Sequence, residues 1–146
     1  LRMRGRPKIK LARTYEEAVR IFNQYRDNML GIISDMSFMH DGVKDPYAGY
    51  KFGQYVRKTG LIIPFVLESS EASNKVYAKE LGASFIDKNS KSYPQDLRKK
   101  IMQRFGFGDF VILNPQTKEE IMRIKGLEGF AKRRSFRYRT IRWFII

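Results

Sequence analysis

Three polar residues, each at the end of a short apolar run, carry the chemistry that the sequence offers most clearly. They are Asp35, Ser69 and Lys88. If the runs are neighbouring strands of one parallel sheet, the three side chains project to the same edge of that sheet. A carboxylate, a hydroxyl donor and an ammonium group placed together could attract a phosphoryl group and neutralise its charge.

Strands that alternate with helices would bring these residues together. Apolar runs too short for helices predict strands at residues 8–12, 29–34, 61–67 and 83–87. Thr14 and Glu17 form a capping box that starts a helix at Tyr15, and further helices are predicted at 50–58, 71–81 and 94–105. This alternation predicts the α/β class, with a doubly wound parallel sheet.

The alternation stops after Gly106. Residues 109–113 and 120–124 predict a β-hairpin with a polar turn, and residues 126–146 show no clear element. We therefore expect three parts: a domain at 7–105, a hairpin extension at 106–125 and a basic, aromatic tail at 126–146.

The charge of the chain is concentrated at its two ends. The 146 residues carry a formal charge of +14, of which +6 lies in residues 1–13 and +7 in residues 123–146. The 109 residues between them carry +1. Such a balance is typical of an ordinary domain surface, so the basic ends and the centre must be interpreted separately.

The composition excludes several classes of protein. There is no Cys, which excludes disulfides and thiolate metal sites, and His40 is the single His, which excludes a His-cluster zinc site. No apolar run approaches the roughly 18 to 20 residues that cross a bilayer, and the Arg-rich start is not followed by a signal-type apolar stretch. A cytoplasmic location is expected.

The sequence resembles the receiver domains of two-component response regulators over roughly residues 7 to 105. The segments that carry the resemblance are residues 31–36 (GIISDM), 63–70 (IPFVLESS) and 82–88 (GASFIDK). The resemblance implies a flavodoxin-like fold and a signalling module without turnover of its own.

The resemblance also implies a role for each site residue. Asp35 would accept a phosphoryl group from a histidine kinase or a small phosphodonor, with Mg²⁺ held by Asp35 and by the main-chain carbonyl of Ser37. Ser69 would close on the phosphoryl group and Lys88 would contact it. Two further residues, Ser70 and Phe85, would form the conformational switch that a fused or separate output domain reads.

Further segments resemble receiver modules attached to proteins of the phosphoenolpyruvate synthase or pyruvate, phosphate dikinase type. These are residues 2–8, 14–18, 41–49, 85–90 and 105–110. No catalytic centre of those enzymes is visible in the chain.

The sequence departs from the receiver pattern at its start. A complete receiver begins with a strand that ends in two acidic, magnesium-binding residues and then has a helix, whereas only seven residues precede the first predicted strand here. Asp41 and Asp45 do not match the missing pair and are interpreted as turn formers. Losing the first strand would expose its neighbours' edges, so we expect a fragment, an internally started product or a dimer that covers the gap.

The basic ends leave an alternative function open. The tail could bind nucleic acid, with bases stacking on Tyr138, Trp143 and Phe144 and phosphates meeting Arg134, Arg137 and Arg139. A third interpretation is that the tail is not native coding sequence, because the composition changes abruptly after about Lys125.

Overall fold

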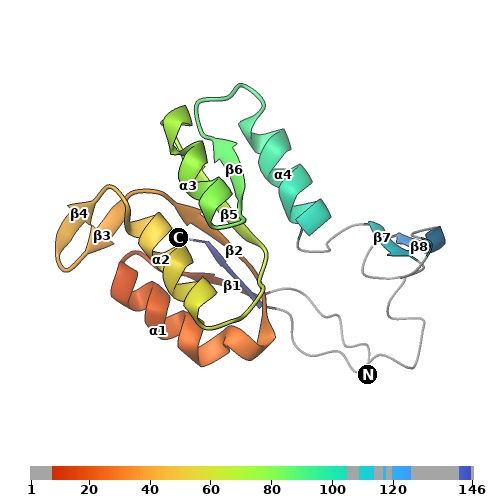
Figure 1. Ribbon diagram of the computed structural model, residues 1–146, viewed down its shortest axis with the longest axis horizontal. Coiled ribbons are helices and arrows are strands. Elements are labelled where there is room, and N and C mark those ends of the chain that lie inside the picture. Colours follow the sequence, from red (N-terminus) through yellow and green to blue (C-terminus); the bar gives the residue numbers. More distant parts are fainter. Residues whose placement is uncertain (1–7, 105–108, 114–116, 118–119, 126–141, 146) are drawn as a thin grey trace.

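Five parallel strands form the main sheet. The structure, a computed structural model, describes residues 8–104, 109–113, 117, 120–125 and 142–145. Neighbouring strands of the sheet are all parallel. In spatial order they are β1 (Lys8–Leu11), β9 (Arg142–Ile145), β2 (Met29–Asp35), β5 (Phe65–Ser69) and β6 (Ser84–Asp87) (Figure 1). The predicted α/β class with a parallel sheet is confirmed.

Four helices lie against this sheet among the described residues. The Thr14 side chain caps the first helix by accepting a hydrogen bond from the Glu17 amide at 3.2 Å, as the capping box predicts. Glu17 in turn accepts from the amide of Arg13 at 3.0 Å, one residue before the cap. The helices are α1 (Tyr15–Tyr25), α2 (Ala48–Lys58), α3 (Lys75–Glu80) and α4 (Tyr93–Arg104), with short 3-10 turns η1 (Arg26–Asn28) and η2 (Ala72–Asn74).

The sheet is covered by helices on both faces. Adjacent residues of β2 belong to different cores, because side chains alternate between the faces of a strand. Ile32 belongs to the larger core, in which Phe22 of α1 and Phe52 of α2 are fully buried. Ile33 belongs to the smaller core, where it packs with Val66, Ile86 and side chains of α4. Each such side chain contributes about 1.5 to 3 kcal/mol on burial.

The face that α4 covers is incomplete at the β1 edge. Ile9 and Leu11 of β1 remain 60% and 56% exposed. Lys10 lies between them in the strand and places its ammonium group over the ring of Tyr25, 4.7 Å from its centroid. That contact is on the α1 side, so Ile9 and Leu11 face the opposite side of the sheet.

The position of β9 corrects the analysis of the tail. Residues 126–146 were expected to contain no clear element, and the sheet was expected to lack its first strand, which would leave the edges of the neighbouring strands exposed. Instead, Arg142–Ile145 lies between β1 and β2, with Trp143 aligned to Ile9 and to Gly31. A strand of the same chain thus lies between β1 and β2, so exposed edges there no longer argue for a dimer, which was one of the expected alternatives.

Smaller differences concern loops and boundaries. The stretch 37–49, for which no helix or strand was predicted, contains an antiparallel hairpin of β3 (Phe38–His40) and β4 (Val43–Asp45). The strand predicted from residue 61 begins only at Phe65, because Pro64 lacks the amide that a ladder needs. The hairpin predicted after Gly106 is present as β7 (Asp109–Leu113) and β8 (Glu120–Lys125).

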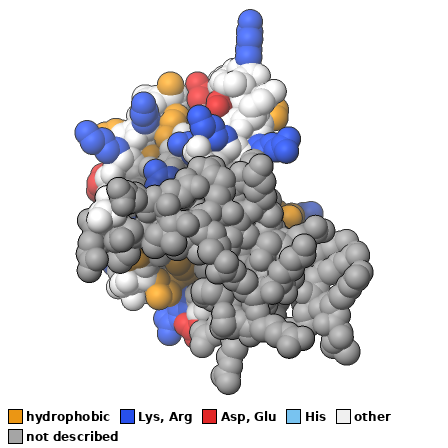
Figure 2. All heavy atoms as spheres, turned by 90° about the vertical axis from the view of Figure 1, so that its right-hand side faces the viewer, with side chains coloured by type: hydrophobic (Ala, Val, Ile, Leu, Met, Phe, Trp, Pro, Cys, Tyr) orange, Lys and Arg blue, Asp and Glu red, His pale blue; other side chains and the backbone are white. Residues whose placement is uncertain are grey.

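The surface carries mixed charge. Figure 2 shows Lys and Arg side chains standing out from the described part of one face, with Asp and Glu side chains among them. None of the helices in the described ranges is both long enough and apolar enough to span a bilayer.

Candidate functional site

The carboxyl ends of β2, β5 and β6 bring the predicted site residues to one edge of the sheet. Asp35, the last residue of β2, is aligned with Glu68 of β5, and Ser69 is aligned with Asp87 of β6. Immediately after β6, the amide of Lys88 donates to the Ser69 carbonyl at 2.8 Å. Because the three strands are parallel neighbours, their ends meet as the sequence predicts.

Asp35 and Lys88 form an ion pair at this edge. The Lys88 ammonium nitrogen lies 2.7 Å from Oδ2 of Asp35, and Oδ1 accepts the Met36 amide at 3.0 Å. The side chains of Asp35 and Lys88 are 32% and 37% exposed, so solvent and small solutes can reach both. Lys88 thus places a positive charge beside a side chain that can act as a nucleophile in its carboxylate form.

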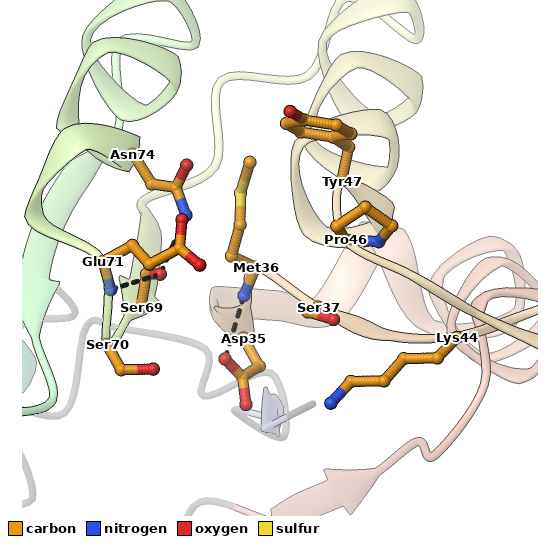
Figure 3. A pocket seen from close by; sticks show the side chains of 10 residues that line it. All are labelled: Asp35, Met36, Ser37, Lys44, Pro46, Tyr47, Ser69, Ser70, Glu71 and Asn74. Carbon is orange, nitrogen blue, oxygen red and sulfur yellow. Dashed lines mark hydrogen bonds between the residues drawn. The ribbon is translucent and has the colours of Figure 1, made fainter.

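Asp35 also lines a polar cavity of about 220 Å³ between β2, the β3–β4 hairpin and the loop after β5 (Figure 3). Three more predicted site residues, Ser37, Ser69 and Ser70, line the same cavity. Phe85 is not among the lining residues; it is partly buried against the larger core. The remaining lining residues are Met36, Lys44, Pro46, Tyr47, Glu71 and Asn74.

The hydroxyl of Ser69 is held in a fixed position. Ser69 is only 5% exposed, and its Oγ accepts hydrogen bonds from the Glu71 amide at 3.1 Å and from Nδ2 of Asn74 at 2.9 Å. A hydroxyl has two acceptor sites and one donor. With both acceptor sites used, its proton can be donated to an anion in the cavity.

The loops after β5 and β6 are tied together beside the site. Nδ2 of Asn89 donates to the main-chain carbonyl of Ser70 at 2.8 Å, and the Asn89 amide donates to Asp87 Oδ1 at 2.8 Å. Ser70 itself is exposed.

Glu68 is a site residue that sequence analysis missed. It is 7% exposed, and its Oε2 accepts a hydrogen bond from the Tyr93 hydroxyl of α4 at 2.8 Å. Burial raises the pKa of the Glu68 carboxyl above its usual range, and burial together with this hydrogen bond raises the pKa of Tyr93 to about 12. The signal in the sequence was an acidic residue directly after the apolar run 61–67.

Asp45 was interpreted from the sequence only as a turn former, whereas its side chain accepts three hydrogen bonds. Its Oδ2 accepts hydrogen bonds from Lys51 at 2.7 Å and from Nδ1 of His40 at 2.9 Å, and its Oδ1 accepts the Tyr47 amide at 2.9 Å. Burial acts to raise the pKa of Asp45, but the hydrogen bonds from Lys51 and His40 outweigh it and lower that pKa to about 2. These bonds fasten the β3–β4 hairpin to the start of α2.

The hairpin is also fastened to α1. The ring of His40 lies against the ring of Tyr15, with centroids 4.2 Å apart, and the Asp41 amide donates to Oε1 of Glu16 at 2.8 Å. Glu16, His40 and Asp41 bring ligand-type atoms within 4.8 Å of one another. Their carboxylates are exposed, so we assign this group to holding the hairpin in place.

Most residues of the predicted nucleic-acid interface lie outside the described residues. This applies to Arg134, Arg137, Tyr138 and Arg139. The backbone of Trp143 and Phe144 belongs to β9.

No protein-family model, curated protein or solved structure matches the chain.

Proposed function

We propose that the protein is a receiver-like signalling module that accepts a phosphoryl group on Asp35. The observation that carries the proposal is that Asp35, which is ion-paired with Lys88, lines a polar cavity that Ser69 also lines. A nucleophilic carboxylate, a cation and a buried hydroxyl are the groups that phosphoryl transfer requires.

The transfer is a displacement at phosphorus. A carboxylate oxygen of Asp35 forms a bond to phosphorus while the bond from phosphorus to the donor breaks. The electron pair of that bond stays with the donor, which is a phosphohistidine imidazole or the carboxylate of a small acyl phosphate. Lys88 and the Ser69 hydroxyl stabilise the negative charge on the phosphoryl oxygens, and the product is an aspartyl phosphate.

The strand order supports a flavodoxin-like, doubly wound fold. In that fold the order of parallel strands is 2-1-3-4-5, and ligands bind where the order reverses. The observed order is β1-β9-β2-β5-β6. If β9 takes the place of strand 1, the two orders correspond, and Asp35 lies at the end of strand 3, next to the reversal.

The oxygen donors at the site suit Mg²⁺. This ion keeps several waters and is commonly bound by one or two carboxylates together with phosphate oxygens. The Asp35 carboxylate and the main-chain carbonyl of Ser37, both at the cavity, would hold it. When bound, Mg²⁺ would neutralise part of the phosphoryl charge.

The response to phosphorylation would pass through the neighbouring strands. The added charge on Asp35 would draw the Ser69 hydroxyl away from Asn74, and Phe85 on β6 would repack at the edge of the larger core. A fused or separate output domain would recognise that change. A histidine kinase as the donor, a cytoplasmic location and the absence of turnover stay predictions.

Intact-mass measurement after treatment with acetyl phosphate and Mg²⁺ tests the proposal. The protein should gain the mass of one phosphoryl group, and the gain should be lost in Asp35→Asn. Asp41→Asn is the matched control, because Asp41 is an exposed carboxylate of the hairpin turn and should leave the gain unchanged. An equal gain in protein and Asp35→Asn would refute the role of Asp35.

A further inference from the structure

Lys44 of β4 lines the Asp35 cavity without a carboxylate partner among the described residues. Its side chain extends from the hairpin toward the Asp35 carboxylate (Figure 3). By contrast, Lys51 and Lys88 are each ion-paired, with Asp45 and Asp35 respectively. Asp35 is therefore already paired with Lys88, whereas Lys44, which lines the cavity, has no such carboxylate partner among the described residues and is available to another anion.

The charge of a phosphoryl group calls for that second cation. A phosphorylated side chain carries about −1.5 to −2 at pH 7, whereas Lys88 supplies one positive charge that Asp35 already uses. Lysine binds phosphate well as a point charge on a flexible stem. We propose that Lys44 binds the phosphoryl group together with Lys88 and stabilises it during transfer to Asp35; this inference rests on the proposed function.

The hairpin that carries Lys44 is held in place from two sides. The next residue, Asp45, is buried and bonded to His40, Lys51 and the Tyr47 amide. The hairpin turn is bonded to α1 through the Asp41 amide. A cation on a fixed backbone needs little reorganisation when charge develops in front of it, which is the condition for effective electrostatic stabilisation.

The alternative is that Lys44 is a solvated surface lysine whose ammonium group lies near the cavity but binds nothing in it. In that case its replacement by a neutral side chain would affect phosphoryl transfer no more than replacement of another exposed lysine. Lys58 at the end of α2 is such a residue: it is exposed and does not line the cavity.

The test compares Lys44→Gln, Lys44→Arg and Lys58→Gln with the unmodified protein at subsaturating acetyl phosphate and fixed Mg²⁺. We expect the rate of phosphoryl mass gain to fall about tenfold in Lys44→Gln, the low end for a charged hydrogen bond at a solvent-accessible site. Lys44→Arg keeps the charge and should retain most of the rate, and Lys58→Gln should match the unmodified protein. Circular dichroism and thermal unfolding check that each variant is folded.

Binding of beryllofluoride supplies a readout that does not depend on transfer. Its half-saturation concentration, followed by backbone amide shifts near Asp35 and Lys88, should rise about tenfold in Lys44→Gln and stay unchanged in Lys58→Gln. Equal rates and equal binding in Lys44→Gln and the unmodified protein would overturn the role of Lys44 and leave that of Asp35 intact. A loss shared by Lys44→Gln and Lys44→Arg would assign the effect to packing and also overturn it. If the unmodified protein gains no phosphoryl mass, the proposed function fails, and the inference fails with it.

Discussion

Replacement of Asp45 by Asn should destabilise the protein in a pH-dependent way. The Asp45 carboxylate is the centre of the bonds that hold the β3–β4 hairpin, and it accepts from Lys51, His40 and the Tyr47 amide. Asn keeps the size of the side chain and one acceptor oxygen but loses the charge. The variant therefore isolates the ionic part of the network.

The size of the effect follows from the pKa of Asp45. The difference between its ordinary value of 3.8 and about 2 in the folded protein corresponds to about 2.4 kcal/mol of stability at neutral pH. Lys51 is 49% exposed, so solvent screening reduces the expected loss in Asp45→Asn to about 1 to 2 kcal/mol. Because the folded-state pKa is depressed, this stability is present in full above the unfolded-state pKa. It falls to about half near pH 3 and is lost as the pH drops through about 2.

Urea unfolding of the two proteins at pH 7 and at pH 3 measures the effect. The difference in unfolding free energy between the protein and Asp45→Asn should be about twice as large at pH 7 as at pH 3. A double-mutant cycle with Lys51→Met at pH 7 should show a coupling energy of about 1 kcal/mol. A loss that is the same at both pH values, with no coupling to Lys51, would refute the assignment of an ionic network at Asp45.

Two further substitutions test the packing around Asp35. Tyr93→Phe leaves the buried Glu68 carboxyl without its hydrogen bond, so the free energy of unfolding in urea should fall by about 1 to 3 kcal/mol. The loss should be smaller in the control Tyr55→Phe, because the Tyr55 hydroxyl donates to the exposed side chain of Asn23. Equal losses in the two variants would contradict this. Gly49 lies at the start of α2, and a Cβ added there would overlap the main-chain carbonyl of Asp35. Gly49→Ala should therefore lower the thermal midpoint, with a cost of about 1 to 3 kcal/mol, and an unchanged midpoint would show that α2 can move away from Asp35.

The sequence predicts the centre of the fold because its signals there are local and agree with one another. The run ending at Asp35 is apolar enough to be buried on both faces, and Ile32 and Ile33 do belong to different cores. The Thr14 cap and the alternation of strands with helices then determine the class of the fold. Asp35, Ser69 and Lys88 meet because parallel neighbours place their carboxyl ends together.

The pairing of β9 with the other strands, and the partners of buried polar side chains, could not be predicted from such local signals. The apolar run of residues 143–146 is only four residues long and follows Arg139 and Arg142. The pairing of β9 with β2, about 110 residues earlier, and with β1, about 130 residues earlier, therefore has no local signature. Asp45 and Glu68 were missed for a similar reason: their partners Lys51, His40 and Tyr93 are set by tertiary contacts. A polar residue in a turn or within a strand does not reveal its partner.

The net charge of +14 would not by itself explain the proposed binding of a phosphoryl group at Asp35. Charges at the ends of the chain act on the cavity only within the screening length, about 8 Å at physiological ionic strength. Lys44→Gln and Lys58→Gln lower the net charge equally, so a whole-protein effect would slow both variants to the same extent, and added salt would remove it. A local effect of Lys44 should instead separate the two variants and persist at about 0.15 M salt, because a contact within a cavity is screened much less than distant surface charges. The comparison of these two lysines therefore decides whether the basic character of the chain or one placed ammonium group would attract the phosphoryl group.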